Sequence, residues 1–354
     1  MKKTMKAIGL MQNPELGNIP NEIKELNVPI PEFGREEVLV KTFASALHVD
    51  ELWAAQGTAS GRFYGTKRVS KEKPYIMGMS LSGVIVKKGD EVTEFNVGDE
   101  VVNILNVKGE RDSWAEYRKL DKKYIMLKPE EFSHKEAAAM IVAGCVAFSM
   151  LLYSKVKKGD QCLVLGASGG IGMVITQMLK VKGAVVTGLC STRNIDAVKD
   201  NGADVIIDYK KEQFSEKLMR QNKKMDVVFD SVGGEGYENE SMKFLKKNGK
   251  FITVVGPERH IGEKKLGWGR VIGIMWYLIR RSIFSRINGP QYIFPIKLPH
   301  HIMEEMFEFV VKNKIKVPFD SVIPLEQKQI SEALGRLASH KATGRIVIEI
   351  GTGI

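Results

Sequence analysis

Residues 163–172 read LVLGASGGIG, and this stretch decides the fold. Branched apolar residues run directly into four glycines, Gly166, Gly169, Gly170 and Gly172. Beyond the last glycine, apolar residues recur at helical spacing, so the pattern predicts a buried strand, a tight turn and an amphipathic helix. Glycine has no Cβ atom, which permits positive φ and lets a ligand approach the backbone closely. The turn is therefore expected to present backbone amides to an anion at the helix N-terminus.

The chain around this stretch repeats a strand followed by a helix. An alanine-rich helix is expected from Ser133, and the strands QCLVLG, AVVTGLC, DVIIDY, DVVFDS and KFITVVG then alternate with helical segments. Such alternation predicts a parallel sheet covered by helices on both faces, with ligands at the carboxyl ends of the strands. A glycine-rich turn alone can be a packing turn, but this one lies inside a strand-helix-strand unit. The sequence therefore predicts a dinucleotide-binding Rossmann domain.

The residues after the second strand of this unit indicate which dinucleotide is bound. An NAD site usually has Asp or Glu there, about 20 residues past the first glycine, to bind the ribose 2′-hydroxyl. Here residues 189–194 read LCSTRN, without an acidic residue. Ser191 and Arg193 suit a 2′-phosphate instead, because a guanidinium binds phosphate through paired hydrogen bonds. The sequence predicts NADPH rather than NADH; the alternative for Arg193 is a solvated surface charge.

The amino-acid composition favours some partners and excludes some kinds of site. Lys and Arg total 53 against 42 Asp and Glu, which gives a net charge of +11 and favours anionic partners such as phosphorylated cofactors. The basic residues are spread along the chain without interleaved aromatic residues, so no nucleic-acid partner is expected. Cys145, Cys162 and Cys190 form no CxxC pair, which excludes a disulfide framework and a cysteine-rich zinc site. This cysteine usage fits a reducing compartment.

Neither a secretory signal nor a transmembrane span is expected, and a cytoplasmic location is predicted. The most membrane-like stretch, VIGIMWYLI at 271–279, is too short for a bilayer that needs about 20 helical residues. It is interpreted as a packed helix or a subunit contact, with peripheral membrane contact as the alternative.

The wider segment 257–300 is expected to be irregular. Trp268, Trp276 and Tyr277 are expected to pack in the interior, the alternative being that they line an acceptor site.

The first 125 residues show short alternating strands separated by turn residues, which predicts a β-rich, barrel-like unit. Together with these strands, the segments GVIVKKGDEVTEFNVGDEVV, AAAMIVAGCVAFSML, GASGGIG, DVIIDYK, VFDSVGG and GRIVIEI resemble the medium-chain dehydrogenase/reductase superfamily. The resemblance implies an α/β protein with a GroES-like β-barrel catalytic domain over 1–127. It further implies a Rossmann cofactor domain with a doubly wound parallel sheet over 128–300, and a return into the catalytic domain over 301–354.

Zinc-dependent members of this superfamily carry their ligands at positions that correspond here to Leu47, Met79, Ser80 and Val142. Zinc takes thiolate, imidazole or carboxylate ligands, so no metal is expected. What remains is similar to the zinc-independent quinone oxidoreductases of the zeta-crystallin type, and within these to the mitochondrial reticulon-interacting oxidoreductases. The resemblance implies NADPH as cofactor and a homodimer as the assembly.

The glycine motif and the resemblance together give the expected cofactor contacts. Tyr209 is expected beside the 2′-phosphate, and Val255 and Gly256 near the nicotinamide. Many relatives have Asn where Leu47 stands and Thr where Val146 stands, which removes two polar groups near the nicotinamide. The full expected set is Val146, Gly166, Ala167, Ser168, Gly169, Gly170, Ile171, Gly172, Ser191, Arg193, Tyr209, Ser231, Val232, Gly233, Val255 and Gly256.

The predicted reaction is hydride transfer from NADPH to an electron-poor conjugated acceptor, in which the protein supplies orientation and a dry site. The expected partner is a small-molecule quinone or related conjugated carbonyl. The alternatives are an enoyl-thioester or enone reductase and a nucleotide-binding scaffold with little turnover. The candidate catalytic residues are Tyr64, Leu47 and Asp50. Tyr64 is the candidate proton donor or else a surface-loop tyrosine, Asp50 contacts substrate or caps a helix, and His48 is interpreted as a buried or hinge histidine rather than a base.

Overall fold

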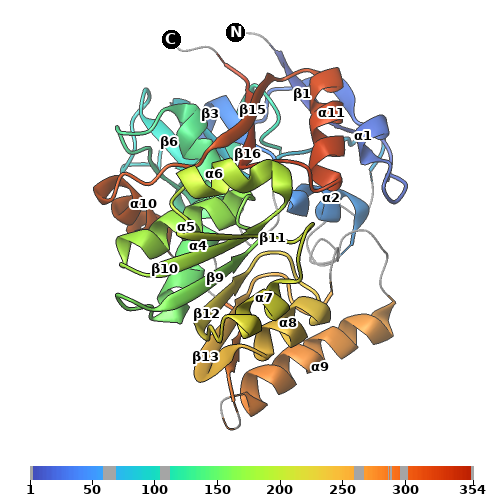
Figure 1. Cartoon of the computed structure of the whole chain (residues 1–354). Helices are drawn as coiled ribbons and strands as arrows, with labels where there is room; N and C mark the ends of the chain where they lie inside the picture. Colours follow the sequence, from blue (N-terminus) through green and yellow to red (C-terminus); the bar gives the residue numbers. More distant parts are fainter. Residues whose placement is uncertain are drawn as a thin grey trace. The chain divides into compact units, whose positions relative to one another are not determined.

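The computed structural model describes residues 3–58, 69–103, 112–258, 267–285, 287, 289–295 and 302–351. The chain forms two compact units, and Figure 1 shows the elements of both. Unit 1 comprises Met1–Val142, Gly262–Lys265 and Phe319–Ile354, and unit 2 comprises Ala143–Ile261 and Leu266–Pro318. The first and the last parts of the chain therefore belong to the same unit.

Unit 1 is built mainly from antiparallel strands. Its strands are β1 (Thr4–Leu10), β2 (Lys24–Pro29), β3 (Glu37–Ala46), β4 (Tyr75–Ile76), β5 (Leu81–Lys88), β6 (Glu100–Asn103), β7 (Tyr117–Asp121), β8 (Ile125–Leu127), β15 (Phe319–Pro324) and β16 (Arg345–Glu349). One sheet has the order β15-β16-β3-β5-β6-β8 with β7 also paired to β3, and the other has the order β2-β1-β4. The C-terminal strand β16 pairs with β3, with Val347 opposite Ala46, and so ties the chain's end to its beginning.

Three helices of unit 1 lie near one apolar core: α1 (Ile19–Glu22), α2 (Val49–Gln56) and α11 (Gln327–Ala338). This core joins strand and helix residues, among them Ile8, Leu47, Leu334 and Ile348. A second core lies between β3, β5 and β6 and includes Val40, Ile85 and Val101. Burial of these branched side chains, at about 1.5–3 kcal/mol each, stabilises the strand pairing.

Unit 2 holds the predicted parallel sheet. Its strands are β9 (Gln161–Leu165), β10 (Val185–Cys190), β11 (Val205–Asp208), β12 (Met225–Asp230), β13 (Leu245–Thr253) and β14 (Gln291–Ile293). All five pairings are parallel, in the order β11-β10-β9-β12-β13-β14. The order reverses direction between β9 and β12, which is the switch point where doubly wound sheets bind ligands at the strands' carboxyl ends.

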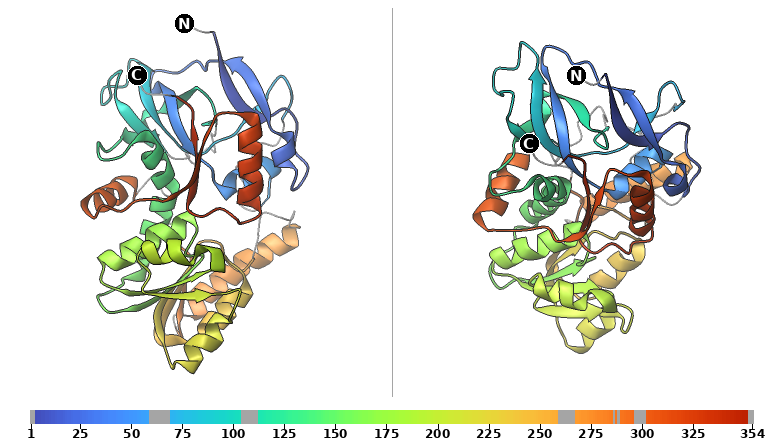
Figure 2. Two further views of the ribbon diagram at one scale, coloured as in Figure 1. Left: turned by 45° about the horizontal axis from the view of Figure 1, so that its top comes forward. Right: turned by 90° about the horizontal axis from the view of Figure 1, so that it is seen from above.

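Helices cover the sheet of unit 2, as the two views of Figure 2 show. They are the last part of α4 (His134–Ser154), α5 (Gly170–Val181), α6 (Ile195–Asp200), α7 (Phe214–Arg220), α8 (Glu235–Met242), α9 (Trp268–Phe284) and α10 (Met303–Lys312). A β-rich unit and a doubly wound α/β unit are the two parts that the sequence predicts, and the α/β fold class is confirmed.

Helix α10 belongs to unit 2, although the sequence places the return to the catalytic domain at residue 301. The ring of Phe309 in α10 is tilted against that of Phe148 with the ring centroids 5.5 Å apart, and Lys182 Nζ lies 5.3 Å from the centroid of the Phe309 ring. Beyond the helix, Gln177 Nε2 donates to the Lys316 carbonyl oxygen at 2.6 Å. In the structure the return therefore begins at Phe319.

The expectation of an irregular segment over 257–300 is wrong for most of its described part. Residues 268–284 form the helix α9, and residues 291–293 form the edge strand β14. Gly269 and Gly273 are residues that disfavour a helix, yet α9 is continuous across both. Its apolar residues recur at intervals of three and four, which is helical spacing. Trp268 and Trp276 are exposed rather than packed in the interior, whereas Tyr277 is partly buried.

Helix α4 is long and apolar enough to cross a membrane if judged by length and composition alone. It is the one such helix in the part of the chain that the structure describes. In the folded protein 83% of its most apolar window is buried, as in the core helix of a globular domain. Its apolar character is therefore accounted for by packing.

Candidate functional site

The glycine-rich stretch forms the turn that the sequence predicts. Strand β9 ends at Leu165, Gly169 is the N-cap, and α5 begins at Gly170. Gly166 has φ +76°, and a Cβ atom there would lie 2.8 Å from Ser231 Oγ. A Cβ atom on Gly172 would lie 2.1 Å from the Gly166 carbonyl oxygen. These positions accept only glycine, and they bring the start of α5 directly against the end of the strand, where its amide groups attract an anion.

The turn after β12 is fixed by the buried carboxylate of Asp230. This carboxylate accepts hydrogen bonds from the amides of Val232 and Gly233 at 2.9 and 3.0 Å. Burial raises the pKa of the Asp230 carboxyl group above its ordinary value, against the lowering effect of the hydrogen bonds. Ser231 Oγ donates to the Leu165 carbonyl oxygen at 3.0 Å. The turn at 231–233 is thereby joined to the end of β9, next to the glycine-rich turn.

The turn after β13 is tied to the same carboxylate through Thr253. Thr253 Oγ1 donates to Asp230 at 2.7 Å and accepts from the amides of Val255 and Gly256 at 3.2 and 3.1 Å. Four of the five residues expected along the cofactor after β12 and β13, namely Val232, Gly233, Val255 and Gly256, are thus held by one buried pair. Asp230 and Thr253 are not among the residues predicted from the sequence; the available signal is the acidic residue that ends β12 after three apolar residues.

The ends of β10 and β11 lie side by side, because Cys190 and Asp208 are partners in the parallel register. Ser191 and Arg193 follow β10, and Tyr209 follows β11, so the three residues predicted around the 2′-phosphate come from adjacent strand ends. The Tyr209 amide donates to the Cys190 carbonyl oxygen at 3.1 Å, and the Tyr209 side chain is 44% exposed. Arg193 is exposed as well.

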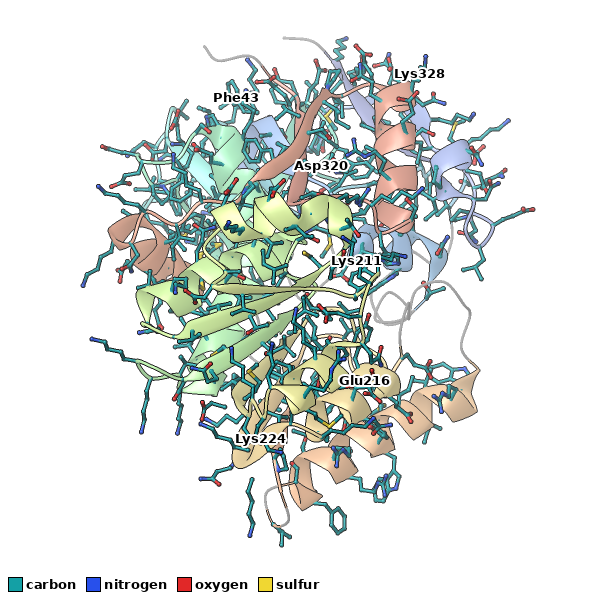
Figure 3. All side chains as sticks on the ribbon, in the orientation of Figure 1. Phe43, Lys211, Glu216, Lys224, Asp320 and Lys328 are labelled. Atoms are coloured by element: carbon teal, nitrogen blue, oxygen red, sulfur yellow. The ribbon has the colours of Figure 1, made fainter. Side chains whose placement is uncertain are left out.

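Two lysines add positive charge at this corner. Lys210 Nζ lies 5.6 Å from the centre of the Tyr209 ring, and Lys211, marked in Figure 3, is in the same turn. The only acid at these two strand ends is Asp208, which accepts from Thr192 Oγ1 at 2.6 Å and from the Lys210 amide at 3.0 Å. The positively charged side chains at these strand ends are therefore open to solvent, whereas the Asp208 carboxylate is occupied by hydrogen bonds within the protein. Arg193 is predicted from the sequence and the two lysines are not, although residues 207–211 (IDYKK) contain both.

The glycine-rich turn also contacts the turn after β10. Asn194 Nδ2 donates to Ser168 Oγ at 2.9 Å, which connects the turn after β10 to the turn after β9. Ala167 is buried, and its amide donates to the Leu189 carbonyl oxygen at 3.2 Å. Ile171 lies in the first turn of α5. The structure thus brings together every cofactor residue predicted from 166 to 256, within unit 2. Val146 lies in the part of α4 that belongs to unit 2 and is partly buried.

Unit 1 contains a buried polar cluster at the junction of β3 and α2. His48 is 3% exposed, and its Nε2 lies 3.0 Å from Ser80 Oγ and 3.0 Å from Arg345 Nη2. The buried Glu51 accepts from the amides of His48 and Met79 at 3.2 and 3.0 Å. Burial lowers the pKa of Arg345 to about 10, while Glu51 and Asp50 raise it. The guanidinium is therefore charged at neutral pH, and its Nη2 lies within hydrogen-bonding distance of both ring nitrogens of His48.

The predicted catalytic residues of unit 1 differ in position. Leu47 is 1% exposed and lies in the apolar core, and Asp50 lies in the first turn of α2. Tyr64 lies outside the described residues. Met79 and Ser80 are buried, and Ser80 bonds His48. Throughout the described ranges, three or more His, Cys, Asp or Glu side chains nowhere come together as a metal-binding group.

Two family models match the chain. The one described as alcohol dehydrogenase GroES-like domain matches residues 34–130, and the one described as zinc-binding dehydrogenase matches residues 201–348. Together they span more than half of the chain; the first falls on the predicted GroES-like domain, and the second on parts of the predicted cofactor domain and of the predicted C-terminal return. The chain belongs to the medium-chain dehydrogenase/reductase superfamily.

Named proteins of the superfamily match between 80% and 92% of this chain. The 2-methylene-furan-3-one reductase of Solanum lycopersicum is 29% identical over 92% of this chain and 74% of its own. The chloroplastic NADPH-dependent alkenal/one oxidoreductase of Arabidopsis thaliana is 27% identical over 92% of this chain and 75% of its own. The mitochondrial NAD(P)H oxidoreductase RTN4IP1 of Mus musculus is 28% identical over 80% of this chain and 72% of its own. The predicted resemblance to the reticulon-interacting oxidoreductases is confirmed.

Among solved structures, the quinone oxidoreductase from Coxiella burnetii superimposes with a TM-score of 0.77. It is 25% identical, and the match covers 99% of this chain and 100% of the other. The architecture of a GroES-like domain and a Rossmann-like parallel sheet is thus shared over the full length.

Proposed function

We propose that this protein is a zinc-independent, NADPH-dependent oxidoreductase that reduces a quinone or a related conjugated carbonyl compound. The observation that carries the proposal is the cationic corner of Arg193, Lys210 and Lys211 beside the glycine-rich turn, with no acid at the end of β10. The relatives' names support it, because furan-3-ones, alkenals, alkenones and quinones are all conjugated carbonyl compounds.

The residues present fit NADPH. Gly166 and Gly172 let α5 start directly against the end of β9, because a Cβ atom there would collide with Ser231 or with the Gly166 carbonyl oxygen. This close packing places the amides at the start of α5 where a pyrophosphate binds. Ser191, Arg193 and the two lysines provide hydrogen-bond donors and positive charge for a 2′-phosphate. The turns at 231–233 and 255–256, held by Asp230 and Thr253, provide rigid backbone along the rest of the molecule.

When bound, NADPH supplies the hydride, and the protein's part is to orient the reactants and to exclude water. In reduction of a conjugated carbonyl, negative charge develops on the acceptor oxygen and favours a nearby hydrogen-bond donor. Tyr64 remains the predicted donor, and Leu47 and Asp50 remain predictions for the acceptor side. The zinc-independent assignment rests on Leu47, Met79 and Ser80, none of which has a side chain that ligates zinc.

The test is a turnover assay on the purified full chain. Oxidation of NADPH is followed with an ortho-quinone, an alkenal and a 2-enoyl thioester in parallel, with NADH as the cofactor control. We expect NADPH-selective turnover with the quinone or the alkenal. Turnover with the thioester alone would assign an enoyl reductase instead. Tight NADPH binding without reduction of any of the three would contradict the proposal in favour of a nucleotide-binding scaffold.

We further propose a cytoplasmic homodimer that does not bind nucleic acid. Strand β14 supports the dimer, because it is the edge of the six-stranded sheet and an edge strand offers unpaired backbone groups to a second copy. Light scattering on the purified protein tests the assembly, and a monomeric mass would contradict it. Cell fractionation tests the location. Titration of duplex DNA at low salt tests the nucleic-acid prediction, because nonspecific binding is strongest there.

A further inference from the structure

Helix α9 exposes an apolar face to solvent. All residues of this helix are at least partly exposed, and its two tryptophans, Trp268 and Trp276, are 64% and 66% exposed. Apolar residues recur on one face at intervals of three and four. The exposed members are Trp268, Ile272, Met275, Trp276, Ile279 and Ile283, with Phe284 beside them and Ile287 one turn further. Continuous exposed apolar surface of this kind marks an interaction site.

The opposite face of α9 is held against the rest of unit 2 by polar contacts. Tyr277 Oη and Arg281 Nε donate to the buried Glu238 carboxylate of α8 at 2.8 and 2.7 Å. Near the start of the helix, Arg270 bonds Glu258. Burial raises the pKa of Glu238, while its hydrogen bonds with Tyr277 and Arg281 lower it.

This arrangement inverts the usual surface helix, in which apolar residues face the core and charges face water. Tyr277 and Leu278 do pack on the apolar core of unit 2, but the two tryptophans and Ile279 point away from it. Figure 1 shows α9 in orange alongside α8. Because the inner face is anchored by ion pairs, the helix holds its apolar face in a fixed position.

The charge of the segment favours an anionic occupant. Residues 267–287 contain four arginines and no aspartate or glutamate, and of these Arg270 and Arg281 pair with Glu258 and Glu238. Arg280 is exposed, one turn after Trp276, and so lies at the margin of the apolar face. A second copy of this face would bring like charges together, whereas an anionic lipid surface neutralises them. Tryptophan next to arginine is also the composition of helices that lie in the headgroup layer of a bilayer.

We propose that α9 is an interfacial membrane helix, which inserts its apolar face into the headgroup layer of a bilayer that contains anionic phospholipid. The helix lies in the plane of the membrane, with the tryptophans and isoleucines toward the acyl chains and Arg280 at the phosphate level. The inference goes beyond the reductase activity and does not depend on it. It assigns the protein a peripheral membrane association.

The experiment uses the full chain and two kinds of vesicle, phosphatidylcholine alone and phosphatidylcholine mixed with phosphatidylglycerol. Co-sedimentation and the blue shift of tryptophan fluorescence report binding. We expect binding to the anionic vesicles, reduced by salt, and weaker binding to phosphatidylcholine alone. The double variant Ile272→Glu with Trp276→Glu should bind about tenfold or more weakly. It removes two apolar side chains from the face and adds two negative charges, which the anionic lipid repels. Arg280→Gln should weaken binding to the anionic vesicles only.

The matched control is Val97→Glu with Leu127→Glu, two exposed apolar residues of unit 1. It changes the net charge by the same amount and should leave vesicle binding unchanged. NADPH affinity, measured in solution for every variant, reports that the fold is intact.

Equal loss of binding in the control, or no binding of the unaltered chain to either vesicle, would overturn the proposal. So would equal binding to both vesicles, since it removes the charge argument. A dimer that the α9 variant converts to monomer, without vesicle binding by the unaltered chain, would assign the face to a second copy instead.

Discussion

Asp230 and Thr253 stand opposite each other at the ends of β12 and β13 and share a buried hydrogen bond of 2.7 Å. Through this pair, four backbone amides on two turns converge on two side chains. Both turns belong to the proposed cofactor site. Loss of this pair is therefore expected to affect both the stability of the sheet and the shape of the proposed cofactor site.

Replacing Thr253 with valine should cost both stability and cofactor affinity. The substitution keeps the shape but leaves a carboxylate oxygen of Asp230 and the amides of Val255 and Gly256 without their partner, which costs about 1–3 kcal/mol. Urea unfolding measures the first effect and NADPH titration the second. Thr187→Val is the control, because the Thr187 hydroxyl is buried without a hydrogen-bond partner among the described residues. If both variants lose equal stability, the pair has no special role.

Replacing Gly172 with alanine should disrupt the glycine-rich turn. The new methyl group would lie 2.1 Å from the Gly166 carbonyl oxygen, so the turn must shift, at a cost of about 1–3 kcal/mol or more. We expect lower thermal stability and loss of NADPH binding. Gly236→Ala in α8 is the control, since a Cβ atom there meets nothing within 4 Å and alanine favours the helix. Unchanged NADPH affinity in Gly172→Ala would show that the cofactor does not depend on this close approach.

The sequence predicts what local geometry determines. The turn from β9 into α5 follows from apolar spacing and glycine positions within ten residues, and the lack of an acid after β10 is equally local. The contacts that organise the site are different. His48 and Arg345 are 297 residues apart, and Asp230 and Thr253 meet only because β12 and β13 are neighbours in the sheet. Single-sequence periodicity contains no information on such pairings.

The exposed face of α9 illustrates a second limit. From the sequence, the apolar stretch at 271–279 is interpreted as a packed helix or a subunit contact, and Trp268 and Trp276 are expected in the interior. The face of α9 that is covered depends on the contacts that its side chains make with the rest of unit 2. Here Tyr277 and Arg281 donate hydrogen bonds to Glu238, so their face lies inward. A buried acid on a neighbouring helix is not visible in the pattern of α9 itself.

Reversing the charge of Arg193 should change the cofactor preference. In Arg193→Glu, a carboxylate repels the 2′-phosphate and can bind a ribose hydroxyl, so NADPH affinity should fall about tenfold or more while NADH affinity holds or rises. Fluorescence titration with both nucleotides measures the ratio. Arg220→Glu, on an exposed residue at the end of α7, makes the same change in net charge away from the site and should leave the ratio unchanged. An unaltered ratio in Arg193→Glu would refute the assignment of this corner to the 2′-phosphate.

His134, at the start of α4, should make unit 1 less stable in mild acid. Its Nδ1 lies 2.7 Å from Ser82 Oγ and its ring stacks on Phe43, while Nε2 lies 3.3 Å from Glu100. Burial lowers the pKa of His134 below its ordinary value of 6.5, although Glu100 raises it. The unfolded chain then binds more protons than the folded one, so the free energy of unfolding falls as pH drops through 6.5 and levels off below the folded pKa.

The measurement for His134 is urea unfolding at a series of pH values between about 7 and 5, above the range in which most carboxylates titrate. His134→Gln cannot be protonated in this range, so part of the pH dependence should disappear, whatever stability the substitution itself costs. His340→Gln, on an exposed histidine, is the control and should retain the slope of the unaltered chain. If His134→Gln keeps that slope as well, the acid sensitivity arises elsewhere in the protein.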